Sequence, residues 1–322
     1  MVMSIRGSYA TPDLQRFTTL WLVLHVFGGL VLLPLVVLSF LLAPKSVPRH
    51  PTLINFCISW IVFSIPYVFL IYAHQEGKED PSFQLCLAQT SMIHGGPPMV
   101  SVAGLAMTIQ LWCTQRQVNL DHRMWWRYSR RFWMIAPPYI AYLFFALLAM
   151  IFGLQHRAKV ISQNQLYCNI QDVGFRFIVP SFTAAIMLCI LICETAIVVT
   201  LLHHRSEVKI LWPLHEERRI SLSLTLRIAL FSMYCCMSLA ACMSLLAEPM
   251  NPFPYMIQAT LPIVAFLVFG TQKDLLRLWC FWKSKGSESP SGSSSIPSAR
   301  GRTSPQIVED LESQSPTGER IV

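Results

Sequence analysis

The chain has 322 residues, of which 53% are hydrophobic and only 13% are charged, with a net charge of +8 and a mean hydropathy of +0.47. Soluble domains usually carry about 25% charged residues. The composition therefore excludes an ordinary soluble domain, gives no reason to expect a nucleic-acid partner, and predicts a membrane protein with several spans.

Seven apolar runs follow one another along the chain. A helix needs about 20 mostly apolar residues to cross a hydrocarbon core of roughly 30 Å, whereas a soluble fold would interleave amphipathic helices or alternating strands. The runs cover residues 17–43, 53–73, 85–113, 133–154, 175–202, 222–246 and 253–270. We therefore expect an all-α membrane protein, with a seven-transmembrane helix bundle within residues 17–271.

The basic residues divide unequally between the two ends of the predicted helices. Cytoplasmic segments of membrane proteins carry an excess of Lys and Arg. If the N-terminus lies outside, the outer segments hold six of the 25 basic residues and the inner segments hold the other nineteen; the six are Arg6, Arg16, Lys78, Arg157, Lys159 and Arg176. The chain is expected to lie in the plasma membrane with residues 1–16 as a short extracellular segment and the C-terminus inside. No signal-peptide pattern precedes the first run.

Two of the ten cysteines lie on the predicted outer side. Cys86 opens the third predicted helix, and Cys168 lies within the loop between the fourth and fifth helices. Both would face an oxidising compartment, where a disulfide would hold this loop as a lid over the bundle. Two unpaired outer thiols are the alternative.

This arrangement of seven helices, an outer N-terminus and an outer cysteine pair resembles the G-protein-coupled receptor fold over about residues 15–283. The runs NFCISWI at 55–61, QLW at 110–112 and FGTQKDLLRLWCFW at 269–282 are similar to the seven-helix receptor-like proteins of basidiomycete fungi. The resemblance implies a receptor that binds an extracellular small molecule, lipid or short peptide in the bundle and signals to a heterotrimeric G protein.

The sequence departs from rhodopsin-like receptors at their activation switches. The third helix ends in QLWCTQR and lacks the acidic-Arg-aromatic triplet, although Arg116 lies nearby. The sixth helix lacks a Cys-Trp-x-Pro motif, and the seventh contains Pro262 without Asn-Pro-x-x-Tyr. The roles of those motifs are therefore not carried over to this chain.

The stretch HGGPP, which begins at His94, interrupts the third predicted helix roughly 12 Å below its outer end. Its two prolines predict a kink, and the carbonyls that a kink frees need protein or water partners inside a bilayer. An imidazole beside such a kink predicts the wall of a ligand site. Alternatively, His94 bonds a neighbouring helix and the two glycines allow close packing. The residues expected to line the site are His94, Tyr67, Gln89, Met92 and Gln258.

Glu194 and Arg227 are ionisable residues near the inner ends of the fifth and sixth predicted helices. Antiparallel neighbours place them at a similar depth, and pairing reduces the cost of a charge inside the membrane. We expect a salt bridge between them, with Arg116 as a competing partner of Glu194. Such a bridge would lock two helices that separate when receptors of this fold admit a G protein. Alternatively, Arg227 reaches the headgroups and Glu194 is protonated.

The inner segments carry signals for contact with membrane lipids. The second inner loop combines five arginines with three aromatic residues, which is typical of an interfacial segment. Residues 272–283 alternate basic and apolar side chains and predict a short amphipathic eighth helix, with Cys280 as a candidate palmitoylation site. Residues 284–322 are rich in Ser, Pro, Gly and charge and predict a disordered cytoplasmic tail.

Other membrane functions require residues that the predicted helices lack. A retinal protein needs a lysine within the seventh helix, but the first one, Lys273, lies beyond its inner end. A zinc hydrolase needs several intramembrane His and Asp residues, and the helices contain only His25 and His94. We expect no metal, cofactor or catalytic site. A multi-pass transporter or channel is the remaining alternative to a receptor, although no internal repeat supports it.

Overall fold

The structure is a computed structural model that describes residues 12–42, 51–73, 82–115, 124–163, 167–207, 215–244 and 253–271. Several predictions fall wholly or largely on residues outside these ranges: the outer segment before residue 12, Arg116, the amphipathic helix at 272–283, Cys280, and the tail at 284–322. They stay predictions.

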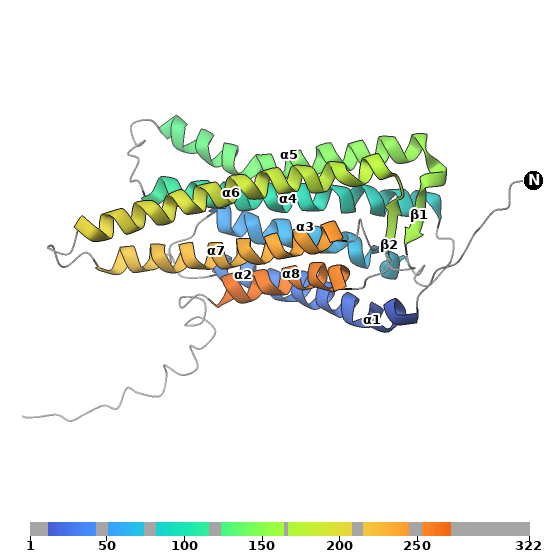
Figure 1. The fold of residues 1–322 in the computed structure, drawn as a ribbon, viewed down its shortest axis with the longest axis horizontal. Coiled ribbons are helices and arrows are strands. Elements are labelled where there is room, and N and C mark those ends of the chain that lie inside the picture. The colour runs from blue at the N-terminus through green and yellow to red at the C-terminus, as the bar shows by residue number, and fades with distance from the viewer. Residues whose placement is uncertain are drawn as a thin grey trace, which may run out of the picture. The chain divides into compact units, whose positions relative to one another are not determined.

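Helices account for most of the described chain (Figure 1). The first helical stretch is continuous and consists of α1 (Pro12–Val23), the π-helical segment η1 (Leu24–Leu32) and α2 (Leu33–Leu42). The remaining long helices are α3 (Pro51–Tyr72), α4 (Phe83–Gln115), α5 (Met124–Gln155), α6 (Val173–Glu207), α7 (His215–Ser244) and α8 (Phe253–Gly270). Each predicted apolar run overlaps one of these stretches, and for α8 the bounds agree.

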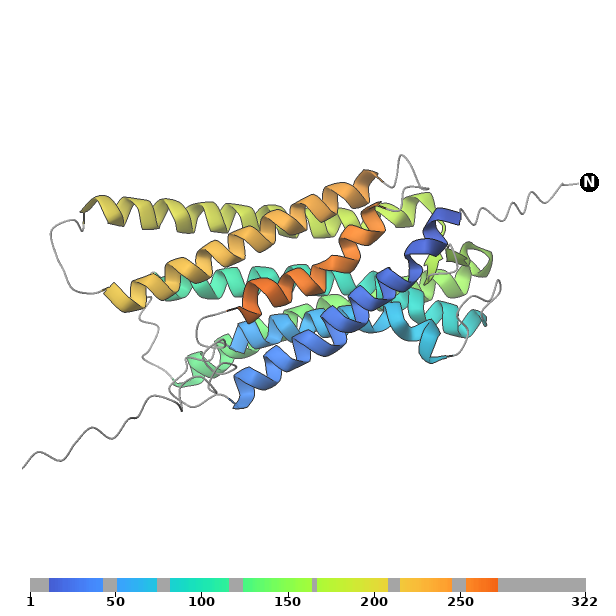
Figure 2. The same cartoon turned by 90° about the horizontal axis from the view of Figure 1, so that it is seen from below.

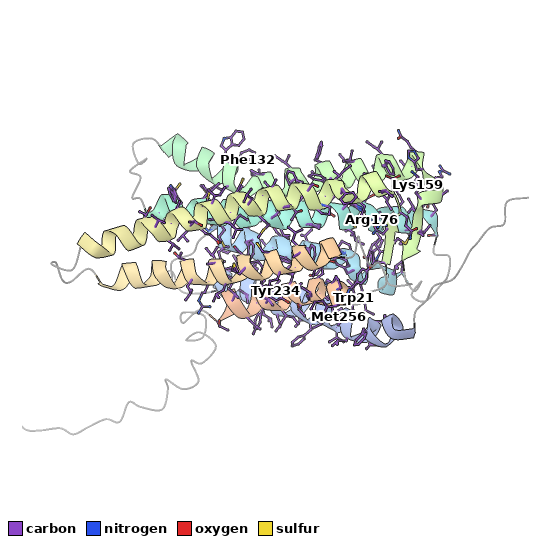
Figure 3. All side chains as sticks on the ribbon, in the orientation of Figure 1. Trp21, Phe132, Lys159, Arg176, Tyr234 and Met256 are labelled. Carbon is purple, nitrogen blue, oxygen red and sulfur yellow. A yellow bond between two sulfur atoms is a disulfide. The ribbon has the colours of Figure 1, made fainter. Side chains whose placement is uncertain are left out.

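Five of the helical stretches are long and apolar enough to cross a membrane; they are Phe17–Leu42, Pro51–Leu70, Phe132–Gln155, Val173–Thr200 and Phe253–Gly270. In α7 the apolar section is the shorter segment Thr225–Ala241. Many of their apolar side chains point outward; Phe132 on α5 is 59% exposed (Figure 3). These features are those of an integral membrane protein.

The loop between α5 and α6 contains a β-hairpin that the all-α prediction lacked. After the short 3-10 helix η2 (Arg157–Lys159), strand β1 (Val160–Gln163) pairs antiparallel with β2 (Tyr167–Ile170), and Ser162 lies opposite Cys168. Cys168 forms a disulfide with Cys86 at the start of α4, with 5.2 Å between their Cα atoms. The predicted disulfide is therefore confirmed, and it attaches a regular hairpin to the bundle.

Helix α4 lies at the centre of the bundle, in contact with α3, α5, α6, α7 and both strands (Figures 1 and 2). The helix continues through Pro97 and Pro98. A Cβ atom on Gly95 would lie 2.8 Å from the backbone oxygen of Tyr142 in α5, and one on Gly96 would lie 2.9 Å from Phe63 in α3. The two glycines therefore allow α4 to approach both neighbours closely, which is the role that the alternative interpretation of the HGGPP stretch gave them.

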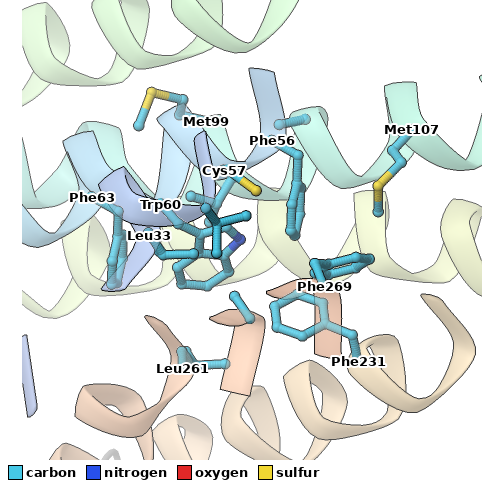
Figure 4. Packing of buried hydrophobic residues seen from close by; sticks show 14 of the residues in the cluster. Leu33, Phe56, Cys57, Trp60, Phe63, Met99, Met107, Phe231, Leu261 and Phe269 are labelled. Carbon is cyan, nitrogen blue, oxygen red and sulfur yellow. The ribbon is translucent and has the colours of Figure 1, made fainter. Parts of the chain in front are cut away.

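A cluster of buried aromatic and aliphatic side chains joins α3, α7 and α8 (Figure 4). The Phe56 ring meets Phe231 and Phe269 nearly edge to face, with centroid distances of 5.4 and 5.2 Å. This is a favourable geometry for aromatic pairs. The cluster fixes α7 and α8 against α3 and so positions the walls of the cavity described below.

Asp172 joins the start of α6 to the segment that precedes the hairpin. Its Oδ1 accepts a hydrogen bond of 3.0 Å from the backbone N–H of Phe175, as an N-cap does. Its Oδ2 pairs with the ammonium group of Lys159. The hydrogen bond from Lys159, followed by that from Phe175, lowers the pKa of the Asp172 carboxyl below its ordinary value.

This lowered pKa predicts a pH-dependent contribution to stability. A carboxylate whose pKa is lower in the folded state stabilises that state above its unfolded pKa of about 3.9, and the contribution is lost as the pH falls through the folded value. We expect Asp172→Asn to lower the unfolding temperature at pH 6–7, and the difference from wild type to shrink below about pH 4. Thermal unfolding in detergent across this range measures it. A difference that is constant with pH would contradict the prediction.

Candidate functional site

A cavity of about 210 Å³ lies within the bundle, between α3, α4, α6, α7 and α8. Aromatic side chains of α3 and α7 form one side of it. The opposite wall comes from one face of α4, where the lining residues recur at the three- and four-residue spacing that places side chains on one side of a helix. These residues are Pro97, Val100, Ser101, Gly104, Met107 and Thr108.

The polar side chains in the α4 wall use their hydrogen bonds within their own helix. Ser101 donates to the carbonyl of Pro98 at 2.9 Å, and Thr108 donates to that of Gly104 at 3.0 Å. Trp60 Nε1 and Thr183 Oγ1, which belong to other lining residues, are buried without a hydrogen-bond partner. Among the residues that the structure describes, no charged side chain lines the cavity. Its interior is therefore mainly apolar.

Of the five residues predicted to line a ligand site, only Gln258 lines this cavity. His94 precedes the outermost lining residue of α4, Pro97, by three positions, and Tyr67 follows Phe63, the outermost of α3, by four. Both therefore lie on the cavity-facing sides of their helices, but roughly 4.5 and 6 Å beyond the lining residues, toward the hairpin. The ligand site expected at these residues therefore stays a prediction, and the cavity begins about one helical turn away from His94 and Tyr67.

The side chains of His94 and Gln89 are occupied by contacts within the protein. His94 Nδ1 donates to the carbonyl of Thr90 at 2.9 Å, and the His94 ring lies 5.1 Å from that of Phe175. Gln89 is fully buried; it donates to the carbonyl of Pro66 at 2.9 Å and accepts from the backbone N–H of Cys168 at 3.0 Å. Gln89 therefore connects α3 to the hairpin. Met92 is partly buried and does not line the cavity.

Four aromatic side chains, which we call the aromatic roof, close the end of this region next to the hairpin: Trp21, Tyr67, Tyr167 and Tyr255. The Tyr167 ring, on β2, has centroid distances of 6.1, 6.0 and 6.3 Å to the other three in that order. None of the four is more than 8% exposed. Tyr67 also accepts a hydrogen bond of 2.9 Å from Gln258, which joins the roof to the cavity wall.

His25 lies beside the aromatic roof and was not among the predicted site residues. It is fully buried, and its ring stacks on Tyr67 with 4.3 Å between the centroids and meets Trp21 edge on at 4.8 Å. Neither ring nitrogen has a hydrogen-bond partner. The sequence could have pointed to His25 because it is an ionisable residue inside an apolar helix. The pattern did not predict that His25 would lie in the π-helical segment η1.

The expected ion pair between Glu194 and Arg227 is replaced by two separate interactions. Ser232 donates a hydrogen bond of 2.6 Å to Glu194 Oε1. Arg227 donates to the carbonyl of Val268, and to both the carbonyl and the hydroxyl of Thr271 at 3.0 Å. Arg227 thus binds the negative C-terminal end of α8.

The rotation of α7 explains this correction. Arg227 and Ser232 are five residues apart, which corresponds to about 140° around a helix. When Ser232 faces α6 and Glu194, Arg227 must face elsewhere, and it faces α8. Similar depth in the membrane was therefore not enough to predict the pair.

Comparison with known proteins gives no relative on which to base a function. No protein-family model matches the chain, and no curated protein matches it either. Within the described ranges, no group of three or more His, Cys, Asp or Glu side chains is placed to hold a metal ion. Function must therefore be inferred from the geometry of the bundle.

Proposed function

We propose that the chain is a seven-helix membrane receptor of the G-protein-coupled kind, with its N-terminus outside the plasma membrane. It binds a small extracellular molecule in the cavity and signals to a heterotrimeric G protein. The observation that carries the proposal is the disulfide between Cys86 and Cys168, which fastens the hairpin to the start of α4 in a bundle of long helices. This is the architecture that the sequence resemblance implies.

The burial of α4 supports its inclusion as a spanning helix although it is not among the five apolar stretches. Its section from Gln89 to Pro98 is polar or contains small and helix-breaking residues, and most of these side chains are buried or partly buried. A helix enclosed by other helices needs no apolar face toward lipid. The proposed orientation places the segments that carry the excess of basic residues on the cytoplasmic side.

The dimensions of the cavity favour a small ligand. Its volume of about 210 Å³ exceeds the roughly 150 Å³ of an engineered apolar cavity that binds benzene. It is smaller than the roughly 300–1,000 Å³ of typical pockets for drug-sized molecules. A small, mainly apolar molecule is therefore a better ligand than a peptide.

The inner ends of α6 and α7 offer a surface for a G protein. Both helices continue past their apolar sections, α6 from Thr200 to Glu207 and α7 inward from Thr225 to His215. The three hydrogen bonds of Arg227 hold α7 against α8 next to this surface. Activation would require α7 to move relative to α6 or α8.

Nucleotide exchange on a panel of fungal Gα subunits tests this function. The full chain in lipid nanodiscs should accelerate exchange on at least one subunit relative to empty nanodiscs. Gly104→Leu serves as the comparison variant, because the leucine side chain would fill the cavity. A Cβ at this position lies in ordinary contact with Ile190 and Phe56, so the backbone of α4 need not move. It should keep basal exchange and lose any response to ligand. No exchange on any subunit by a correctly inserted chain would reject the receptor and favour a transporter or channel.

A further inference from the structure

The inner end of the cavity lies next to a buried carboxyl group. The α6 residues that line the cavity include Thr183, Met187 and Ile190. Glu194 is the next residue on the same helix face, four positions farther inward. Its side chain is only 7% exposed, so it lies inside the bundle and does not face lipid or water.

Ser232 connects this carboxyl group directly to the cavity. It lines the cavity from α7, and its hydroxyl donates a hydrogen bond of 2.6 Å to Glu194 Oε1. The carboxyl is therefore one hydrogen bond away from a side chain that lines the cavity. No side chain that lines the cavity is charged among the described residues, so the Glu194 carboxyl is the acidic group placed to act on the contents of the cavity.

Glu194 also has no positively charged partner among the residues that the structure describes. Arg227 on α7 was the expected partner of Glu194. It donates its hydrogen bonds instead to Val268 in the last turn of α8 and to Thr271, which follows that helix. A buried carboxylate with one hydroxyl partner is costly in an apolar environment. A cationic group entering the cavity would offset this cost.

We propose that Glu194 anchors the ligand and that the ligand is a small apolar amine. This inference rests on the proposed receptor function and specifies its ligand class. The apolar body occupies the cavity, and the ammonium group binds the Glu194 carboxylate at its inner end, in place of the hydrogen bond from Ser232. A charge-assisted hydrogen bond is about twice as strong as a neutral one, so the amine is favoured over an alcohol of the same shape.

A metal cation fits this site less well than an amine. Metal cations such as Ca²⁺ take about six to eight oxygen ligands, whereas Glu194 and Ser232 supply only a carboxylate and one hydroxyl. No larger group of acidic or metal-binding side chains converges here within the described ranges. An ammonium group needs few partners and brings its own apolar body, which matches the cavity wall.

A matched pair of probes tests the inference. The full chain in nanodiscs is heated with 2-phenylethylamine or with 2-phenylethanol, which have the same number of non-hydrogen atoms. We expect the amine to raise the unfolding temperature of the wild type at concentrations about tenfold lower, which corresponds to about 1.4 kcal/mol. Glu194→Gln should make the two probes equivalent. Asp172→Asn removes a carboxylate at the outer end of α6 and should keep the preference for the amine.

Four results would overturn the inference. The first two are that the probes stabilise the wild type equally and that neither probe stabilises it. The third is that Glu194→Gln keeps the preference for the amine. The fourth is that Arg116→Gln and Glu194→Gln destabilise the protein non-additively, which would assign the carboxyl to an internal ion pair. In each case exchange on a Gα subunit could still succeed, so failure of the amine site and failure of the receptor function are distinguishable.

Discussion

Replacing Cys86 and Cys168 together by alanine should lower the free energy of unfolding by about 2–4 kcal/mol. The bridge joins residues 82 positions apart, so it restricts the unfolded chain over a long loop. It also holds β2 in place, where the Cys168 N–H bonds Gln89 and the neighbouring Tyr167 enters the aromatic roof. A larger loss is not expected, because separated helices remain inserted in a bilayer and keep part of the loop ordered.

Unfolding in detergent, followed with and without a reducing agent, measures this effect. Reductant should lower the stability of the wild type and leave the double variant unchanged. The control is Cys189→Ala, because Cys189 is an exposed free cysteine on α6 and its removal should change stability by less than about 0.5 kcal/mol. Equal unfolding midpoints for the wild type and the double variant would show that the bridge contributes nothing.

Gly29→Ala should destabilise the bundle by about 1–3 kcal/mol. A Cβ on Gly29 in η1 would lie 2.0 Å from Ser64 Oγ and 2.3 Å from Ser64 Cβ in α3. A Cβ is fixed by the backbone and cannot rotate away, so η1 and α3 would have to separate. The separation would also loosen the contact of η1 with α8.

A second substitution in α3 distinguishes this steric cause from other effects. Ser64→Gly removes both clashing atoms and should recover stability in the Gly29→Ala background, whereas Ser64→Ala removes only Oγ and should recover less. Gly174→Ala is the control, because its Cβ would meet only Asp172 Oδ1 at 3.5 Å. If Ser64→Ala recovers as much stability as Ser64→Gly in the Gly29→Ala background, the contact with the Cβ of Ser64 is not the cause of the destabilisation.

The helices could be predicted from sequence because hydropathy is a property of each residue along the chain. The run at 253–270 coincides with α8, and the run at 85–113 lies within α4. The disulfide could be predicted because the order of the helices places Cys86 and Cys168 on the same side. The hairpin was missed because strands of four residues, such as β2, give little periodic signal.

The candidate site could be predicted only in part, because its depth depends on side chains from other elements. His94 and Tyr67 lie on the cavity-facing sides of α4 and α3, but Tyr167 and Phe175 fill the space beside them. The pairing of Arg227 depended on the rotation of α7 about its axis. A helix with apolar residues on most sides, as α7 has, gives no clear signal of that rotation.

The central position of α4 has a consequence for how the protein is made. A helix with Gln89, His94 and two prolines in its outer half lacks the apolar surface needed to enter a bilayer by itself. If it spans the membrane as proposed, its integration must wait until α5 has left the ribosome and can cover it. The cysteine bridge can close only after β2 has followed. A chain that stops between α4 and α5 should therefore be retained and degraded during biosynthesis.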